Sequence, residues 1–381
     1  MKYYLVGGAV RDQLLGLPIK DRDWVVVGET PESLKQKGFQ QVGNDFPVFI
    51  HPKTKEEYAL ARTERKQGHG YTGFICDFSP QISLEEDLIR RDLTINAIAQ
   101  DELGNLIDPF NGINDLNKKV LRHVSNAFSD DPLRVLRVAR FLARFFCLGF
   151  VIAPETLNLM QSMVAKKELN YLTAERVWLE TKKALESKNP EQYFLTLQSI
   201  DALPVIFPEL ADYLKHMEKY HLNNLLGNIT DIIPSIPVRL SQISLIRFAK
   251  LFYSLSLDSI KHLCKRLNLP KDFLKLTLHC SQYAHLFKNA FNLSSTEIVT
   301  LFTKLDLWRN KENINLIRQV FGELYIKEGS FLWECYQIAL KEDVQSVIND
   351  GFQKAEITQE LNLRRAKKIE IYLANTNQLL E

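Results

Sequence analysis

The sequence reads GGAVRDQLLG at residues 7–16 and KDRDWVVVG at residues 20–28, and these two stretches decide the fold. In the first, a short apolar run meets two glycines and continues as a helical pattern, which is typical of a strand that turns directly into a helix. In the second, Asp21 and Asp23 stand two positions apart at the start of an apolar run rich in valine. Because side chains alternate along a strand, both carboxylates are predicted on one face.

The paired carboxylates suit a hard divalent cation. Mg²⁺ takes oxygen ligands and bridges one or two carboxylates to substrate phosphates. Two such ions activate an attacking hydroxyl and stabilise a leaving pyrophosphate. By itself, a pair of aspartates at this spacing is weak evidence for a metal site and is more often a solvated turn.

The glycine turn offers a second feature. Gly7 and Gly8 expose backbone N–H groups at a helix N-terminus, where phosphate oxygens bind well. Arg11 follows one turn into the helix and can reach the same place with its planar guanidinium. The alternative is a tight turn that carries a surface arginine.

Composition indicates an ordinary globular protein of more than one domain, since the 381 residues are 45% hydrophobic. A formal net charge of +2 means that a nucleic-acid partner has to be inferred from local clusters. Five scattered cysteines without a C-x-x-C pair indicate neither a disulfide framework nor a zinc site, so a cytoplasmic location is expected. No signal peptide and no bilayer-spanning stretch is predicted, and no obligate protein partner is evident.

The pattern divides the chain into three predicted parts. Residues 1–122 form an α/β head on a mixed sheet, residues 123–222 a helical neck, and residues 223–381 a helical body and tail. Predicted strands cover residues 3–6, 24–27, 48–51, 58–61 and 106–108. A capping box at Ser83 and Glu86 predicts a helix over 84–99, and Pro132 in a first turn predicts another to about residue 146. The best linker candidate is 223–237.

Several ordered motifs resemble one family. After the two opening stretches come TERK (63–66), YTGF (71–74), EDLIRRDLTINA (86–97), DPFNG (108–112) and DPLRVLRVARF (131–141). Together they resemble the polymerase-β-like nucleotidyltransferases, in particular the class II tRNA nucleotidyltransferases (bacterial CCA-adding enzymes) and the bacterial poly(A) polymerases, over roughly residues 1–210. The resemblance implies a magnesium-dependent transferase that builds the 3′-terminal CCA of tRNA from CTP and ATP. Asp21 and Asp23 would then be the catalytic metal ligands.

Two arginine-bearing segments are candidates for nucleotide binding. On the predicted helix over 84–99, Arg91 falls within the apolar stripe while Arg90 points away from it, so Arg91 needs an anion. That anion is a nucleotide phosphate or an internal carboxylate, Asp87 or Asp92. Asp92 and Asn96 are expected to support the site. On the next helix a one-sided stripe of cations favours contact with phosphate or base; it comprises Arg134, Arg137, Arg140 and Arg144.

Base choice follows from hydrogen-bond chemistry. Cytosine and adenine both present an amino donor beside an unprotonated ring nitrogen, whereas uracil and guanine reverse both groups. Asp131 as acceptor and Arg134 as donor would select the first pair, and in the resembling enzymes the pattern E-D-x-x-R has this role. Here Asp130 replaces its first glutamate. The alternative is a helix cap with an i,i+3 salt bridge. The segment 62–73 has the composition of a mobile basic loop or of a plain surface loop.

The second half departs from many relatives. They append a phosphohydrolase domain with a His-Asp pair, but Tyr253 and Ser254 stand where that pair is expected. We therefore expect a degenerate remnant without hydrolase activity that holds tRNA. The basic segment 363–368 is expected either to contact the tRNA backbone or to form a solvated face. Alternatives to a CCA-adding activity are a poly(A) polymerase, a partial enzyme that adds only CC or only A, and a catalytically silent RNA-binding module.

Overall fold

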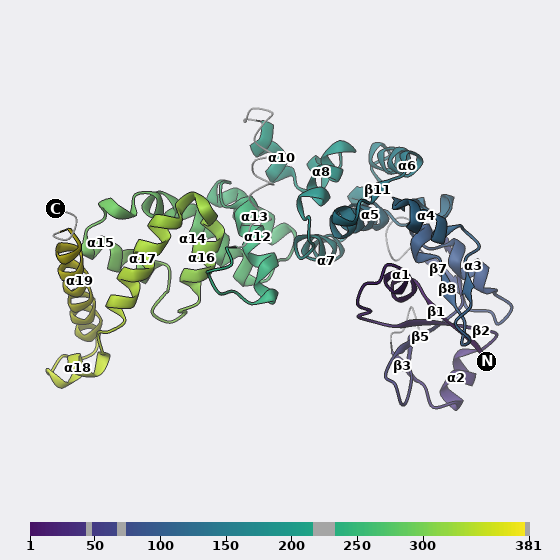
Figure 1. Ribbon diagram of the computed structural model, residues 1–381, viewed down its shortest axis with the longest axis horizontal. Coiled ribbons are helices and arrows are strands. Elements are labelled where there is room, and N and C mark those ends of the chain that lie inside the picture. Colours follow the sequence, from purple (N-terminus) through teal and green to yellow (C-terminus); the bar gives the residue numbers. More distant parts are fainter. Residues whose placement is uncertain (43–47, 67–73, 216–232, 378–381) are drawn as a thin grey trace. The chain divides into compact units, whose positions relative to one another are not determined.

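The structure is a computed structural model that describes residues 1–42, 48–66, 74–215 and 233–377. The chain forms two compact units, Met1–Pro208 and Glu209–Glu381 (Figure 1). The predicted division at 122/123 lies inside the first unit, and the division at 222/223 lies outside the described residues, as does most of the proposed linker. Among the described helices none is long and apolar enough to cross a membrane.

The N-terminal unit is built on a seven-stranded mixed sheet, as predicted. Its strand order is β3-β4-β5-β2-β1-β8-β9, and within it only β2 and β5 pair in parallel. The bounds are β1 Lys2–Val6, β2 Asp23–Val27, β3 Gln40–Val42, β4 Val48–Ile50, β5 Glu57–Leu60, β8 Ala99–Gln100 and β9 Leu106–Ile107. A separate hairpin pairs β6 (Thr63–Lys66) with β7 (Phe74–Asp77).

Alternation along β2 gives the sheet two covered faces. Val25 packs into a cluster with Leu88 of α3 (Leu84–Ile89), whereas Val26 packs with Leu34 of α2 (Pro31–Gln36). Each valine is almost fully buried. Because successive side chains point to opposite faces of a strand, a strand covered on both faces needs apolar residues at successive positions. The glycine turn joins β1 to α1 (Gly8–Leu14) at the edge of this core.

The helix predicted over 84–99 is wrong in its second half. The capping box at Ser83 and Glu86 forms, but α3 ends at Ile89. Beyond it the Asp92 carboxylate accepts the backbone N–H of Leu93 at 2.8 Å, and the Thr94 N–H donates to the Arg122 carbonyl at 2.9 Å. Aspartate commonly competes with helical hydrogen bonds in this way, and a tertiary pairing captures the rest of the segment.

The helix predicted from Pro132 is confirmed as α5 (Leu133–Phe145), which packs against α7 (Ala174–Leu185) and α8 (Glu191–Ser199). Other elements complete this part of the unit: α4 Gly112–Lys118, β10 Val120–Leu121, β11 Val151–Ile152, α6 Pro154–Ala165 and α9 Leu203–Ile206. Val135, Val138 and Phe145 of α5 are fully buried, so its predicted apolar face is confirmed there.

The C-terminal unit is helical throughout its described residues. Its main helices are α12 Ile243–Phe252, α13 Leu257–Arg266, α14 Lys271–Lys288, α15 Ser295–Lys304, α16 Asn313–Phe321, α17 Ile326–Ala339, α18 Val344–Asn349 and α19 Ala355–Asn377. α10 (Pro208–Lys215) spans the division between the units. The core is rich in aromatic side chains, with Phe287, Phe302 and Tyr336 nearly or fully buried. An α/β head followed by helices therefore describes the chain, as predicted.

Candidate active site

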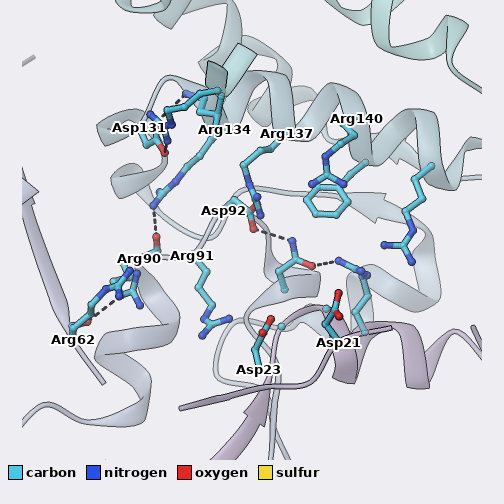
Figure 2. Close-up of a pocket in the computed structure, with 18 residues that line it drawn as sticks. Asp21, Asp23, Arg62, Arg90, Arg91, Asp92, Asp131, Arg134, Arg137 and Arg140 are labelled. Carbon is cyan, nitrogen blue, oxygen red and sulfur yellow. Dashed lines mark hydrogen bonds and ion pairs between the residues drawn. The ribbon is translucent and has the colours of Figure 1, made fainter. Parts of the chain in front are cut away.

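A cavity of about 610 Å³ lies within the N-terminal unit, between the sheet edge and α5 (Figure 2). It gathers side chains from the glycine turn, the start of β2, the segment after α3, α5 and the first turn of α7. Its arginines are Arg11, Arg62, Arg90, Arg91, Arg134, Arg137, Arg140, Arg144 and Arg176, and its aspartates are Asp21, Asp23, Asp92 and Asp131. Such an excess of cations around one cavity favours a polyanionic ligand.

Asp21 and Asp23 point into the cavity from the sheet side (Figure 2). Asp23 opens β2 and pairs in register with Val6, so the sheet places it beside the glycine turn. The protein packed around Asp23 raises its pKa; Arg91 opposes this rise and Asp21 adds to it. Within the described part of the chain, neither carboxylate has a hydrogen bond or an ion pair with another side chain.

Gly7 is glycine for two reasons. Its φ of +67° is a conformation that other residues rarely adopt, and a Cβ atom there would lie 2.9 Å from Nη1 of Arg91. Gly8 begins α1 and lines the cavity beside it. The turn therefore brings backbone and the Arg91 guanidinium close together at one wall of the cavity.

Arg11 is not a surface residue, so that alternative is wrong. It is 3% exposed, donates from Nη1 to Oδ1 of Asn96 at 2.5 Å, and pairs with Asp12 at 2.8 Å. Its guanidinium also lies over the rings of Phe141 and Phe145. Burial lowers the pKa of Arg11 to about 10 against the opposing effect of Asp12, and the side chain still borders the cavity.

Arg91 lies at the cavity, although the helical geometry used to select it was wrong. It has an internal partner, because Nη2 donates to Oδ2 of Asp87 at 3.1 Å. Its Nε is buried and has no hydrogen-bond partner. Arg90, expected to point away, shares Asp87 and also lines the cavity. Asp87 therefore holds two adjacent arginines and leaves Arg91 with unused hydrogen-bonding capacity.

Asp92 and Asn96 line the cavity, and each is bonded to other side chains of the site. Asn96 donates from Nδ2 to Asp92 at 2.8 Å, and Arg137 pairs with the other Asp92 oxygen at 2.6 Å. Burial alone would raise the pKa of Asp92, but Arg137 and Asn96 outweigh it and hold the pKa far below its usual range. Asp92 is therefore a permanent anion between the head and α5.

The arginine stripe of α5 faces the cavity and is already paired. Arg140 pairs with Glu180 of α7, and Arg137 reaches the same carboxylate at 3.8 Å. Arg144 pairs with Asp12 at 2.8 Å. Together with the contacts of Arg11, Asn96 and Asp92, these pairs form an ion-pair chain, defined as Arg144, Asp12, Arg11, Asn96, Asp92, Arg137, Glu180 and Arg140.

Asp131 and Arg134 both line the cavity, but each has other partners. Arg134 donates to the backbone carbonyls of Ala127 and Arg90 at 2.7 and 2.5 Å. Asp131 accepts the Leu133 N–H at 3.0 Å and pairs with Arg176 at 2.7 Å. The helix cap of the alternative interpretation is therefore present. The ion pair of Asp131, however, is with Arg176.

Sequence reasoning missed Asp12, Arg90, Arg176 and Glu180 as residues that line or support this site, whereas Arg62 begins the segment that was predicted as a mobile basic loop. Arg176 and Glu180 stand four positions apart on α7, and this spacing puts both on one helix face. That pattern was available in the sequence, whereas the partners of Asp12 and Asp87 depend on long-range packing. The segment 62–73 lies partly outside the described residues; its described start, Arg62, accepts from Nε of Arg90 through its carbonyl at 3.1 Å.

In the C-terminal unit the basic segment 363–368 is mostly engaged within the unit. Arg364 pairs with Asp350 at 2.6 Å, Arg365 lies over the ring of Trp308 at 3.8 Å, and Lys368 pairs with Glu342 at 2.8 Å. These contacts favour a structural role over the predicted tRNA contact. No cluster of three or more metal-binding side chains is found in the described ranges.

Comparisons with known proteins identify the family of the chain. The family model "Poly A polymerase head domain" matches residues 3–122, and "Probable RNA and SrmB- binding site of polymerase A" matches residues 149–214. A CCA-adding enzyme of Actinobacillus succinogenes is 49% identical, covering 97% of this chain and 98% of its own. A multifunctional CCA protein of Pasteurella multocida is 50% identical, with 96% of each chain covered.

Solved structures share the fold. A CCA-adding enzyme in complex with CTP superposes with a TM-score of 0.70 at 23% identity, covering 100% of this chain and 91% of its own. The Thermotoga maritima CCA-adding enzyme complexed with tRNA gives 0.69 at 23% identity, covering 100% and 92%. On the strength of the two near-full-length relatives, the chain belongs to the CCA-adding enzymes of the tRNA nucleotidyltransferase and poly(A) polymerase family.

Proposed function

We propose that the chain is a CCA tRNA nucleotidyltransferase. It adds or repairs the 3′-terminal CCA of tRNA from CTP and ATP without a nucleic-acid template and releases pyrophosphate. The observation that carries this proposal is the cavity in which Asp21 and Asp23, two carboxylates without an ion pair or hydrogen bond to a side chain of the described residues, face a wall of arginines. Relatives of nearly the same extent bear the name of this activity.

Magnesium fits the carboxylate pair. The other two cavity aspartates, Asp92 and Asp131, are occupied by arginine, whereas Asp21 and Asp23 keep their oxygen lone pairs available. Oxygen donors of this kind are what Mg²⁺ prefers. When bound, the ion would lower the pKa of the attacking hydroxyl and neutralise charge on the leaving pyrophosphate. Asp21 and Asp23 are therefore proposed as the catalytic residues.

The triphosphate would lie against the glycine turn. Gly7 and Gly8 let the phosphates approach the backbone, and Arg11 and Arg91 flank them. Arg91 lines the cavity while Asp87 holds its Nη2. Arg137 and Arg140 complete the wall from α5, and Asp92 and Asn96 hold Arg137 and Arg11 in place. Catalysis would come from positioning and charge neutralisation rather than from covalent chemistry.

Base selection is assigned to Asp131 and Arg134. Asp131 accepts from the amino group of cytosine or adenine, and Arg134 donates to the ring nitrogen beside it. Replacing either residue by alanine should lower the ratio of kcat/KM for CTP over UTP by about 1 to 3 kcal/mol in ΔΔG‡, while the carboxylate pair still supports transfer. Variants that lose rate but keep the wild-type ratio would mean that the base is read elsewhere.

A poly(A) polymerase is the second candidate, because the head model that matches carries that name. Partial enzymes that add only CC or only A would share the same site. The deciding experiment supplies a tRNA transcript without its terminus and labelled CTP, ATP or both. Complete CCA ends only with both nucleotides support the proposal, and long A tails from ATP alone support the alternative.

The reaction is assigned to the cytoplasm. The cysteines at 147, 264, 280 and 335 are unpaired, which suits a reducing compartment. Expected partners are tRNA, ATP and CTP, and the cavity can be formed by one chain, since all its lining residues lie in the N-terminal unit.

A further inference from the structure

Phe141 of α5 is an aromatic side chain that lines the cavity among its arginines. It is 4% exposed, and three guanidinium groups lie around its ring. The distance from the ring centre to the guanidinium carbon is 4.1 Å for Arg140, 5.1 Å for Arg11 and 5.6 Å for Arg137. One ring therefore contacts arginines of both α1 and α5.

The ion-pair chain around this ring carries more positive than negative charge. Its four arginines meet three carboxylates, those of Asp12, Asp92 and Glu180. Burial lowers the pKa of Arg140; Glu180 opposes this effect and the neighbouring Arg137 adds to it. The face of an aromatic ring attracts a guanidinium without neutralising its charge. The ring can thus hold these cations together and leave their excess positive charge for a ligand.

Arg140 shows which donors remain available beside the ring. Its Nε pairs with Glu180, whereas neither Nη group has a hydrogen bond or an ion pair within the described residues. Because the carboxylate holds Nε and the ring of Phe141 lies against the guanidinium, the group has little freedom to rotate. Its two Nη groups are therefore a fixed pair of donors for phosphate oxygens at the cavity.

We propose that Phe141 is a positioning residue for nucleotide binding: its ring orders the guanidinium groups of Arg11, Arg137 and Arg140 and thereby strengthens their binding of the triphosphate. This inference rests on the proposed placement of the triphosphate against these arginines. Phe141 is assigned no contact with the base, so triphosphate binding and base choice can be separated by experiment. The simpler interpretation is that Phe141 only fills the core beneath the cavity.

The test weakens the electrostatic attraction of the ring and keeps its shape. Fluorine withdraws electron density from the face of the ring, so Phe141 is replaced in turn by mono-, di- and trifluorophenylalanine. The KM values for CTP and ATP should rise stepwise, by about fivefold over the series, because each step weakens contacts to the guanidinium groups. The effect should fall on KM more than on kcat, and the CTP/UTP ratio of kcat/KM should stay at the wild-type value.

Pyrophosphate gives a second measurement, because it carries phosphates without a base. Its inhibition constant against CTP should rise in parallel with KM along the fluorinated series, whereas inhibition by cytidine should not change. Phe141→Leu removes the ring and should show at least the full loss. Phe141→Tyr keeps a ring of the same kind and should recover most of the wild-type binding.

Phe150 is the matched control. It is 1% exposed in the same unit, its ring centre lies 5.3 Å from that of Phe145, and no cation of the described residues lies over its ring. Phe150→Leu and fluorinated rings at this position should change thermal stability and keep KM and pyrophosphate inhibition at the wild-type values. The same result at Phe141, with stability changed and binding unchanged, would overturn the inference.

The outcomes also distinguish this inference from the function on which it rests. If pyrophosphate does not compete with CTP on the wild-type protein, the placement of the triphosphate itself is wrong. If pyrophosphate competes there and the Phe141 variants do not weaken it, only the role of Phe141 is wrong. If the fluorinated series changes the CTP/UTP ratio, the ring acts on the base and its assignment to the triphosphate is wrong.

Discussion

The two units of the chain accommodate buried cations in different ways. In the N-terminal unit Arg11 and Arg140 face the buried carboxylates Asp12 and Glu180 around a cavity. In the C-terminal unit Arg365 lies 3.8 Å from the centre of the Trp308 ring and has a buried Nε without a hydrogen-bond partner. A cation held by carboxylates at a cavity can also attract a ligand phosphate, whereas a cation on a ring stabilises packing. We therefore expect chemistry to depend on the first unit alone.

The largest expected effect tests the carboxylate pair. Asp21→Ala or Asp23→Ala should lower nucleotide addition by at least about 1000-fold, because each removes an oxygen ligand for the metal. Binding of tRNA, measured by filter retention or gel shift, should survive. Asp258→Ala in the C-terminal unit is the control, since Asp258 is exposed and pairs only with Lys261 in the recorded ion pairs. Substantial turnover by either active-site variant in magnesium would refute the metal assignment.

The next effect concerns stability and its pH dependence. Asp92→Asn should destabilise the N-terminal unit by roughly 3 kcal/mol at neutral pH, because Arg137 loses its buried anion. The folded-state pKa of Asp92 lies below its ordinary value of about 3.9, so its stabilising contribution is present above that value and is lost as pH falls below it. Urea unfolding from pH 7 to pH 3 should show a constant difference between the variant and the wild type down to about pH 4, and a difference that begins to shrink below that pH.

Replacement of Arg365 in the C-terminal unit is the corresponding test there. Arg365→Met should alter the free energy of unfolding by less than about 1 kcal/mol, because Arg365 has no ion pair within the described residues, only a weaker electrostatic interaction with Glu342, and an apolar chain of similar length can cover the Trp308 ring. A loss as large as that of Asp92→Asn would show that the two units do not differ in the way described here.

A smaller effect is expected from the close contact between Gly7 and the Arg91 side chain at the glycine turn. Gly7→Ala should cost more stability and activity than Gly16→Ala, although both positions have nearly the same positive φ, 67° and 66°. At Gly16 nothing lies within 4 Å of the new Cβ, whereas at Gly7 Nη1 of Arg91 lies 2.9 Å away. We expect a backbone penalty at both sites, larger at Gly7 because its ψ of −123° lies outside the left-handed helical region, and a further loss of kcat/KM only at Gly7. Equal activities in the two variants would contradict the proposed role of the Gly7 contact.

No effect is expected in the last test. The purified protein should release no phosphate from 2′,3′-cyclic or 2′-phosphorylated nucleotides, with or without an added transition metal, because Tyr253 and Ser254 stand in place of the His-Asp pair. Hydrolysis above background that is lost on mutation within residues 215–290 would give the second unit a chemistry of its own.

Local patterns predicted much of this molecule. The strand at residues 24–27, the apolar face of α5 and the capping box of α3 are each fixed by neighbouring residues, and the structure confirms all three, although Asp21 lies outside β2 and not on its face as predicted. The end of α3 could not be predicted, because it depends on pairing with residues near Arg122. Arg91 reached the cavity despite a wrong helical assignment, since the segment after Ile89 folds back instead of continuing.

The sequence did not predict which acidic side chains pair with the arginines of the site. The stripe of Arg137, Arg140 and Arg144 was predicted to attract phosphate, but the structure gives it Asp92, Glu180 and Asp12 as partners. These acids are remote in sequence, and only the packed unit brings them together. The site assignments of Asp131 and Arg134 stay predictions, to be decided by the base-ratio experiment.

The ion-pair chain has a consequence for synthesis on the ribosome. Of its members, Glu180 is the last to be made. A nascent chain that ends before α7 already contains α5, with Arg137 and Arg140 lacking one of their acids. The charge of this helix is therefore compensated on the α7 side only once Glu180 has been added.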